Sequence, residues 1–146
     1  MLGSSLDLTH LRMNIFTYKL IEIKHPFSYE NGFEFSENFD GLIKIGKYTF
    51  LFNLKMICDS GGAQTRSLRE VHNFIHSQLE YCLENENTKY FFINILDGDE
   101  SNYKMKYITH LLNKKRYKKN NFNIYCGDMY DFFIWKIKNQ LYFSTK

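Results

Sequence analysis

The chain has 146 residues, of which 44% are hydrophobic and 18% are aromatic. This is enough apolar material for one packed core, and it argues against a globally disordered chain. The formal charge of +3 neither requires nor excludes a nucleic-acid partner, so the placement of the charges matters more than their sum.

Cysteine usage and the N-terminus bear on the cellular compartment. Cys58, Cys82 and Cys126 are odd in number and widely spaced, and they form no CxxC or Cys/His zinc pattern. No apolar stretch is long enough to span a bilayer, and the N-terminus lacks the basic and apolar regions of a signal peptide. We therefore expect a cytoplasmic protein with no membrane partner. We expect one domain over residues 1–146, with residues 1–36 as an N-terminal segment and 37–146 as the core.

The N-terminal segment gives a mixed signal. Apolar positions between Leu6 and Lys24 fit a helix imperfectly, whereas residues 19–24 alternate as a strand does, and both interpretations stay open. Pro26 ends whichever element forms. Residues 27–38 are polar, and Asn31-Gly32 indicates a turn.

The next elements are better defined. Residues 42–45 and 48–57 predict two strands of a β-hairpin, joined by a turn at Gly46-Lys47. A flexible break at 59–62 follows. Apolar residues at three- and four-residue steps then predict a long helix over 65–86, beginning at Thr65 or Ser67 because both can cap it.

The C-terminal half alternates strands and helices. Residues 90–96 are apolar throughout, which is typical of a central strand covered on both faces. A helix starting at Ser101, a strand over 122–126 and a last helix, capped by Asp128 and running through Trp135, follow. This order predicts an α/β fold with a mixed central sheet flanked by helices.

Three residues of the hairpin suggest chemistry. Asp40 stands at the head of the first strand, and Asn53 and Lys55 share one face of the second. A carboxylate, a second oxygen ligand and a lysine on one sheet face suit Mg²⁺-assisted phosphodiester hydrolysis. The alternatives are that Asp40-Gly41 simply forms a turn and that Lys55 is an edge-strand charge.

A longer pattern surrounds these residues. The stretch FDG…FNLKMICDSGGAQTRSLREVHNFI, residues 39–75, resembles a block found in some type II restriction endonucleases of the PD-(D/E)xK nuclease superfamily. The resemblance extends more weakly through YFFINILDGD and IYCGDMYDFF. It implies a restriction-endonuclease-like core, Mg²⁺ as cofactor, double-stranded DNA as substrate and a homodimer that cuts both strands.

The resemblance also implies roles for the three hairpin residues. Asp40 and Asn53 take the metal-ligand positions, and Lys55 takes the position that acts on the attacking water and the phosphate. Asn53 departs from the family pattern, which has an acidic residue there, and an amide is the weaker Mg²⁺ ligand. Glu37 and Asp59 are candidates to assist. The chain is also short for a restriction enzyme.

The GGAQTR segment predicts DNA contacts. Two glycines let a backbone approach a ligand closely, and the following helix N-terminus favours phosphate. We place Arg66 and Arg69 in the first turn of that helix, where cations are unfavourable unless an anion is present. Together with Gln64 and Thr65 they are the predicted DNA-binding residues.

Two other functions compete with an active nuclease. One is a catalytically weak or inactive, truncated DNA-binding relative, which Asn53 favours. The other is a nucleotide-binding regulatory α/β domain with Gly61-Gly62 as a phosphate cradle, although that loop lacks the usual glycine patterns. His72 and His76 are interpreted as a polar helix flank rather than a metal pair. The basic run 114–119 is interpreted first as a solvated loop and second as a DNA contact.

Overall fold

A computed structural model describes residues 11–22, 36–56, 62–97 and 101–139 of the chain. Predictions for Pro26, for Asn31-Gly32 and for Asp59 fall outside these residues. The described elements, in chain order, are β1 (Leu11–Asn14), β2 (Leu20–Glu22), β3 (Ser36–Asn38), β4 (Gly41–Ile45), β5 (Tyr48–Met56), α1 (Gly62–Glu84), β6 (Tyr90–Asp97), α2 (Ser101–Leu112), the 3-10 turns η3 (Lys115–Tyr117) and η4 (Asn121–Asn123), β7 (Ile124–Gly127) and α3 (Met129–Lys138).

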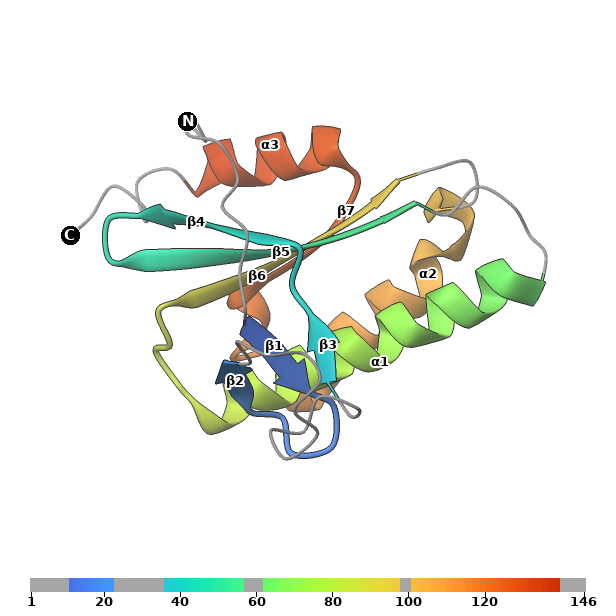
Figure 1. The fold of residues 1–146 in the computed structure, drawn as a ribbon. Helices are drawn as coiled ribbons and strands as arrows, with labels where there is room; N and C mark the ends of the chain where they lie inside the picture. Colours follow the sequence, from blue (N-terminus) through green and yellow to red (C-terminus); the bar gives the residue numbers. More distant parts are fainter. Residues whose placement is uncertain (1–10, 23–35, 57–61, 98–100, 140–146) are drawn as a thin grey trace.

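The larger sheet of the described chain has the strand order β4-β5-β6-β7 (Figure 1). β4 and β5 form the predicted antiparallel hairpin, with Ile45 opposite Tyr48 and Gly46 at a φ of 59° in the turn between them. β5, β6 and β7 are parallel to one another. The sheet is therefore mixed and open, as the element order predicts.

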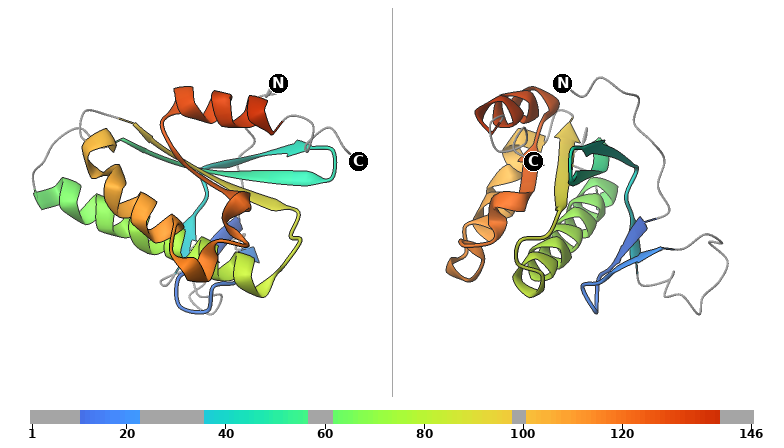
Figure 2. Two further views of the ribbon diagram at one scale, coloured as in Figure 1. Left: turned by 180° about the vertical axis from the view of Figure 1, so that it is seen from behind. Right: turned by 90° about the vertical axis from the view of Figure 1, so that its left-hand side faces the viewer.

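Helices cover both faces of this sheet. α1 and α2 connect the parallel strands and lie side by side on one face, and α3 lies on the other (Figures 1 and 2). The prediction of an α/β fold with a mixed central sheet flanked by helices is confirmed. Among the described residues, no helix is both long and apolar enough to cross a membrane.

β6 lies in the middle of the core. Its residues 91–96 are all buried, as the uninterrupted apolar run predicts for a strand covered on both faces. Phe92 and Leu96 pack toward α1, whereas Phe91 and Ile93 pack toward α3. Since both faces are apolar, burial of this strand contributes to two hydrophobic clusters at once.

The stripe predicted for α1 is also confirmed. Val71, Ile75, Leu79 and Cys82 are all buried against the sheet. The predicted start of the helix at Thr65 or Ser67 is wrong, because α1 begins at Gly62. Ala63 and Gln64 are good helix formers, so nothing local prevents the helix from beginning before its capping residues.

Residues 11–22, the described part of the N-terminal stretch, form two strands, so the helical interpretation is wrong for these residues. β1 pairs with β2 and with β3 in a small antiparallel sheet. The Asn14 side chain accepts hydrogen bonds from the amides of Phe16 and Thr17, and Tyr18 has a φ of 60°, so a tight turn replaces helical continuation. Met13 is fully buried and packs in the core on the α1 side.

The last helix begins at the predicted cap. Asp128 accepts a hydrogen bond from the Asp131 amide at 2.7 Å, and α3 then runs to Lys138, three residues beyond the predicted end at Trp135. Phe132 packs against Phe52 of β5, which fixes α3 on the sheet.

Candidate functional site

Asp40 lies where the chain passes from β3 into β4. Phe39 and Leu42 both pack into the core on the α1 side, although residues three apart in a regular strand point to opposite faces. The alternation therefore breaks at Asp40 and Gly41, as it does in a β-bulge. The Asp40 amide donates to the carbonyl of Phe52 at 2.7 Å, and Gly41 is paired with the same residue. Bulges re-aim side chains, and here the re-aimed group is a carboxylate.

The Asp40 carboxylate is held against β5. Its Oδ2 atom accepts a hydrogen bond from the Leu54 amide at 2.7 Å. This bond gives β5 one more hydrogen-bond partner beyond its last backbone pair with β4. It places the carboxylate at the edge of β5 beside Leu54, the residue between Asn53 and Lys55. This hydrogen bond is compatible with a turn-forming role and with a metal-ligand role for Asp40, because a carboxylate accepts more than one bond.

Asn53 forms part of a buried amide network. Its side chain is 1% exposed, and its Nδ2 atom donates to Oδ1 of Asn94 on β6 at 3.1 Å. Gln78 of α1 pairs with the same Asn94 amide through two hydrogen bonds of 3.0 and 2.8 Å. The Asn94 amide also donates to the carbonyl of Tyr125 on β7 at 3.2 Å. Both donors and both acceptor lone pairs of Asn94 are thereby used.

This network links β5, β6, β7 and α1 through side chains that are fully buried. Buried polar groups need partners, and here the partners are one another. The geometry gives Asn53 a structural contribution to the core, and its ligation of a metal stays a prediction. Asn94 was missed by the sequence analysis, although an asparagine inside the apolar run YFFINIL is itself a sign of a buried hydrogen-bond network.

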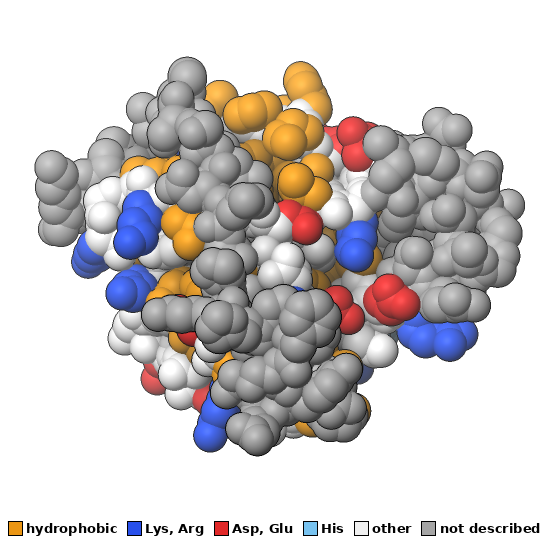
Figure 3. Space-filling view, viewed as in Figure 1, with side chains coloured by type: hydrophobic (Ala, Val, Ile, Leu, Met, Phe, Trp, Pro, Cys, Tyr) orange, Lys and Arg blue, Asp and Glu red, His pale blue; other side chains and the backbone are white. Residues whose placement is uncertain are grey.

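Lys55 has a charged neighbour on another element. Leu51, Asn53 and Lys55 lie at every second position of β5, so their side chains share one face of the strand. Leu51 packs on the α1 side, and the half-buried Lys55 therefore projects toward α1 as well. It interacts electrostatically with Glu37 of β3, which also interacts with Glu70 of α1. Figure 3 shows acidic and basic side chains next to one another where these elements meet.

The pKa of Glu37 reflects this environment. Burial raises its pKa above the usual range, the positive charge of Lys55 works in the opposite direction, and Glu70 raises it further. Arg12 of β1 also favours the charged form. That Glu37 assists this site stays a prediction, and its electrostatic interaction with Lys55 is consistent with it. Glu70 was not predicted, because only the packing of α1 brings it there.

The GGAQTR segment differs from its prediction. Since α1 begins at Gly62, Arg66 and Arg69 lie in its second turn, so their assignment to the first turn is wrong. The helix dipole acts mainly on charges in the first turn, so it does not disfavour Arg66 and Arg69 in the second turn. Arg69 is exposed and available to a partner, while the side chains of Gln64, Thr65 and Arg66 lie outside the described residues.

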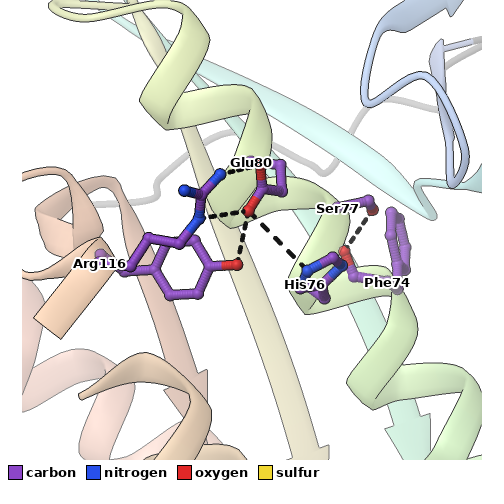
Figure 4. Close-up of polar contacts among 6 residues, drawn as sticks. Phe74, His76, Ser77, Glu80 and Arg116 are labelled. Atoms are coloured by element: carbon purple, nitrogen blue, oxygen red, sulfur yellow. Dashed lines mark hydrogen bonds and ion pairs between the residues drawn. The ribbon is translucent and has the colours of Figure 1, made fainter. Parts of the chain in front are cut away.

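The basic run lies away from Lys55. α2 runs from the carboxyl end of β6 back to the start of β7, so residues 114–119 lie at the opposite edge of the sheet from the end of β5 (Figure 1). Within this run Arg116 makes two hydrogen bonds to Glu80 of α1, at 2.9 and 3.0 Å, and Tyr117 donates to the same carboxylate at 2.6 Å (Figure 4). Arg116 and Tyr117 therefore attach η3 to α1, a contact that neither the solvated-loop nor the DNA-contact interpretation of the run predicted.

His72 and His76 lie one turn apart on α1. His76 lies 3.9 Å from Glu80, and burial, followed by the nearby His76 and Lys114, lowers the pKa of His72. In the part of the chain that the structure describes, no three His, Cys, Asp or Glu side chains are grouped so that they could hold a metal ion. Comparisons of the chain with protein-family models, with curated proteins and with solved structures found no match.

Proposed function

We propose that this chain is a Mg²⁺-dependent endonuclease that cleaves duplex DNA within a restriction system. The observation that carries the proposal is that Glu37 interacts electrostatically with both Lys55 and Glu70, while Asp40 accepts a hydrogen bond from the Leu54 amide next to Lys55. Lys55 belongs to the carboxyl half of β5, for which the sequence predicts phosphodiester chemistry. A restriction-endonuclease-like core remains part of this proposal.

The carboxylates of the site are proposed to hold the metal ion. Mg²⁺ in nucleases and polymerases is commonly held by one or two carboxylates together with water and phosphate oxygens, so a cage of three protein ligands is not required. Asp40 and Glu37 are the proposed ligands, with Glu70 nearby. A bound cation would polarise the phosphate and activate water.

Lys55 is proposed to act on the substrate. Its ammonium group offsets negative charge that develops on the phosphate, and its half-buried position strengthens that interaction relative to one in water. Asn53 is proposed as a positioning residue that holds β5 to β6 beneath Lys55, in place of a strong metal ligand. Gln64, Thr65, Arg66 and Arg69 are the proposed DNA contacts.

One observation favours a second candidate, a DNA-binding relative that does not cut. The position that carries a carboxylate in active relatives holds Asn53, whose amide is committed to the buried network. A nuclease that had lost its second acidic ligand could keep such an amide as part of the core. DNA binding by Arg69 would survive that loss.

Cleavage and binding assays distinguish the two candidates. The purified full chain is incubated with supercoiled and long linear duplex DNA, in Mg²⁺ and in EDTA. Discrete Mg²⁺-dependent bands that disappear in Lys55→Ala and persist in Lys44→Ala, an exposed lysine on the neighbouring β4, support the nuclease. Gel retardation without cutting supports the second candidate. Absence of both activities on any DNA removes both proposals.

A further inference from the structure

The outer side of α3 carries a stripe of large apolar side chains. Tyr130, Phe133, Ile134 and Ile137 follow the i, i+3, i+4, i+7 spacing of one helix face, and they are 74%, 46%, 37% and 67% exposed. Phe132, on the other side of the helix, is completely buried against the sheet. Hydrophobic side chains gather over α3 in Figure 3. A helix with one side already in the core ordinarily exposes polar residues, so this stripe indicates an interaction surface.

The charges beside the stripe are arranged in a particular order. Asp131 and Lys138 are seven residues apart, so they lie almost above one another along the same flank of the stripe. Lys136 lies on the other flank, with Met129. One flank therefore has a negative charge near its beginning and a positive charge at its end, and the other flank has no negative charge.

We infer that α3 is the interface of a homodimer in which two copies of the helix pack antiparallel about a two-fold axis. Such an axis brings the same flank of each helix together and reverses its direction. Asp131 then lies opposite Lys138 of the partner subunit, and Ile134, on the same side of the stripe, lies next to Ile134 of the partner subunit near the axis. A parallel pair would instead bring Lys138 close to Lys136 of the partner subunit, which is repulsive.

The self-complementary charge order thus selects a second copy of this chain as the occupant, and it selects the antiparallel orientation. The inference does not rest on nuclease activity, because α3 lies on the opposite face of the sheet from α1 (Figure 2), which is the helix toward which Lys55 projects. A homodimer was expected only from the family resemblance, and the charges on α3 now give it a defined surface.

Sedimentation of the full-length protein over a range of concentrations tests the inference. The parent protein should dimerise, and Ile137→Glu should raise the dimer dissociation constant at least about tenfold, because it buries an unpaired charge. The control is Lys119→Glu, an exposed lysine in the connection between α2 and β7, which should leave dimerisation unchanged. Circular dichroism verifies that each variant is folded.

A charge exchange tests the orientation. Asp131→Lys and Lys138→Asp should each weaken the dimer, and the double variant should restore it, because the pair is then reversed on both sides of the two-fold axis. A parent that stays monomeric would overturn the inference, whether its stripe binds anionic lipid vesicles or residues 140–146 of its own chain. A dimer insensitive to Ile137→Glu would overturn it as well. A double variant no tighter than the single ones would overturn the antiparallel arrangement.

Discussion

Replacing Asn53 by aspartate separates a ligand role from a core role. The substitution exchanges the Nδ2 donor for an oxygen that faces Oδ1 of Asn94, 3.1 Å away in the parent. The Asn94 amide cannot rotate to compensate, because its own donors are engaged with Gln78 and with the carbonyl of Tyr125. A main-chain carbonyl only accepts hydrogen bonds, so it fixes the orientation of the whole network.

The expected cost depends on pH. Below the unfolded-state pKa of about 3.9 the variant carboxyl is protonated and donates to Asn94, so the loss of stability is small. Burial raises the folded-state pKa of the new carboxyl, and each unit of that rise costs about 1.4 kcal/mol at higher pH. With a rise of about two to three units, the loss reaches about 3–4 kcal/mol by pH 7. It then stays constant once the pH exceeds the folded-state pKa.

Urea unfolding measures this loss. Trp135 is the only tryptophan of the chain and packs against Tyr125 and Phe132, so its fluorescence reports on the core. Curves for parent and Asn53→Asp should nearly coincide in acid and separate as pH rises. Asn73→Asp, the same change at an exposed site on α1, should follow the parent throughout. A deficit independent of pH, or stability restored by millimolar Mg²⁺, would refute the network argument and return Asn53 to the metal site.

Three further substitutions have defined outcomes. Glu80→Gln should lower the free energy of unfolding by about 1 kcal/mol at pH 7. The hydrogen bonds from Arg116 lower the pKa of Glu80, so this contribution is present above its unfolded pKa and is lost as pH falls through the folded one, and the urea curves should converge in acid. Arg69→Ala should weaken DNA binding and reduce the salt slope by roughly one without altering the urea midpoint, which gel retardation at several salt concentrations measures. Asp128→Ala removes the cap of α3 and should cost about 1 kcal/mol, measured by thermal unfolding, whereas Asp131→Asn should cost less because its side chain is not the cap.

Several elements could be predicted because their signals are local. The β4–β5 hairpin follows from two apolar runs around Gly46, and α1 follows from the stripe that includes Val71 and Ile75. The doubly covered β6 follows from an uninterrupted apolar run, and the cap at Asp128 follows from one side chain and the next turn of backbone. In each case the residues that decide the structure lie within a few positions of one another.

The small sheet could not be predicted in the same way. β2 and β3 have three residues each, too few for a periodic signal, and β3 is the polar sequence SEN. β3 forms because β1 pairs with it after an intervening stretch of more than ten residues. Only the folded chain brings those backbones together.

The candidate site also depends partly on local sequence and partly on tertiary contacts. The sequence by itself determines that Asp40 precedes a strand and that Asn53 and Lys55 share a face of the next one. Only the tertiary structure decides that Asn53 is buried against Asn94 and that Glu37 interacts with both Lys55 and Glu70. These interactions join residues 18 to 41 positions apart, and their energies depend on burial and orientation, which local sequence patterns do not encode.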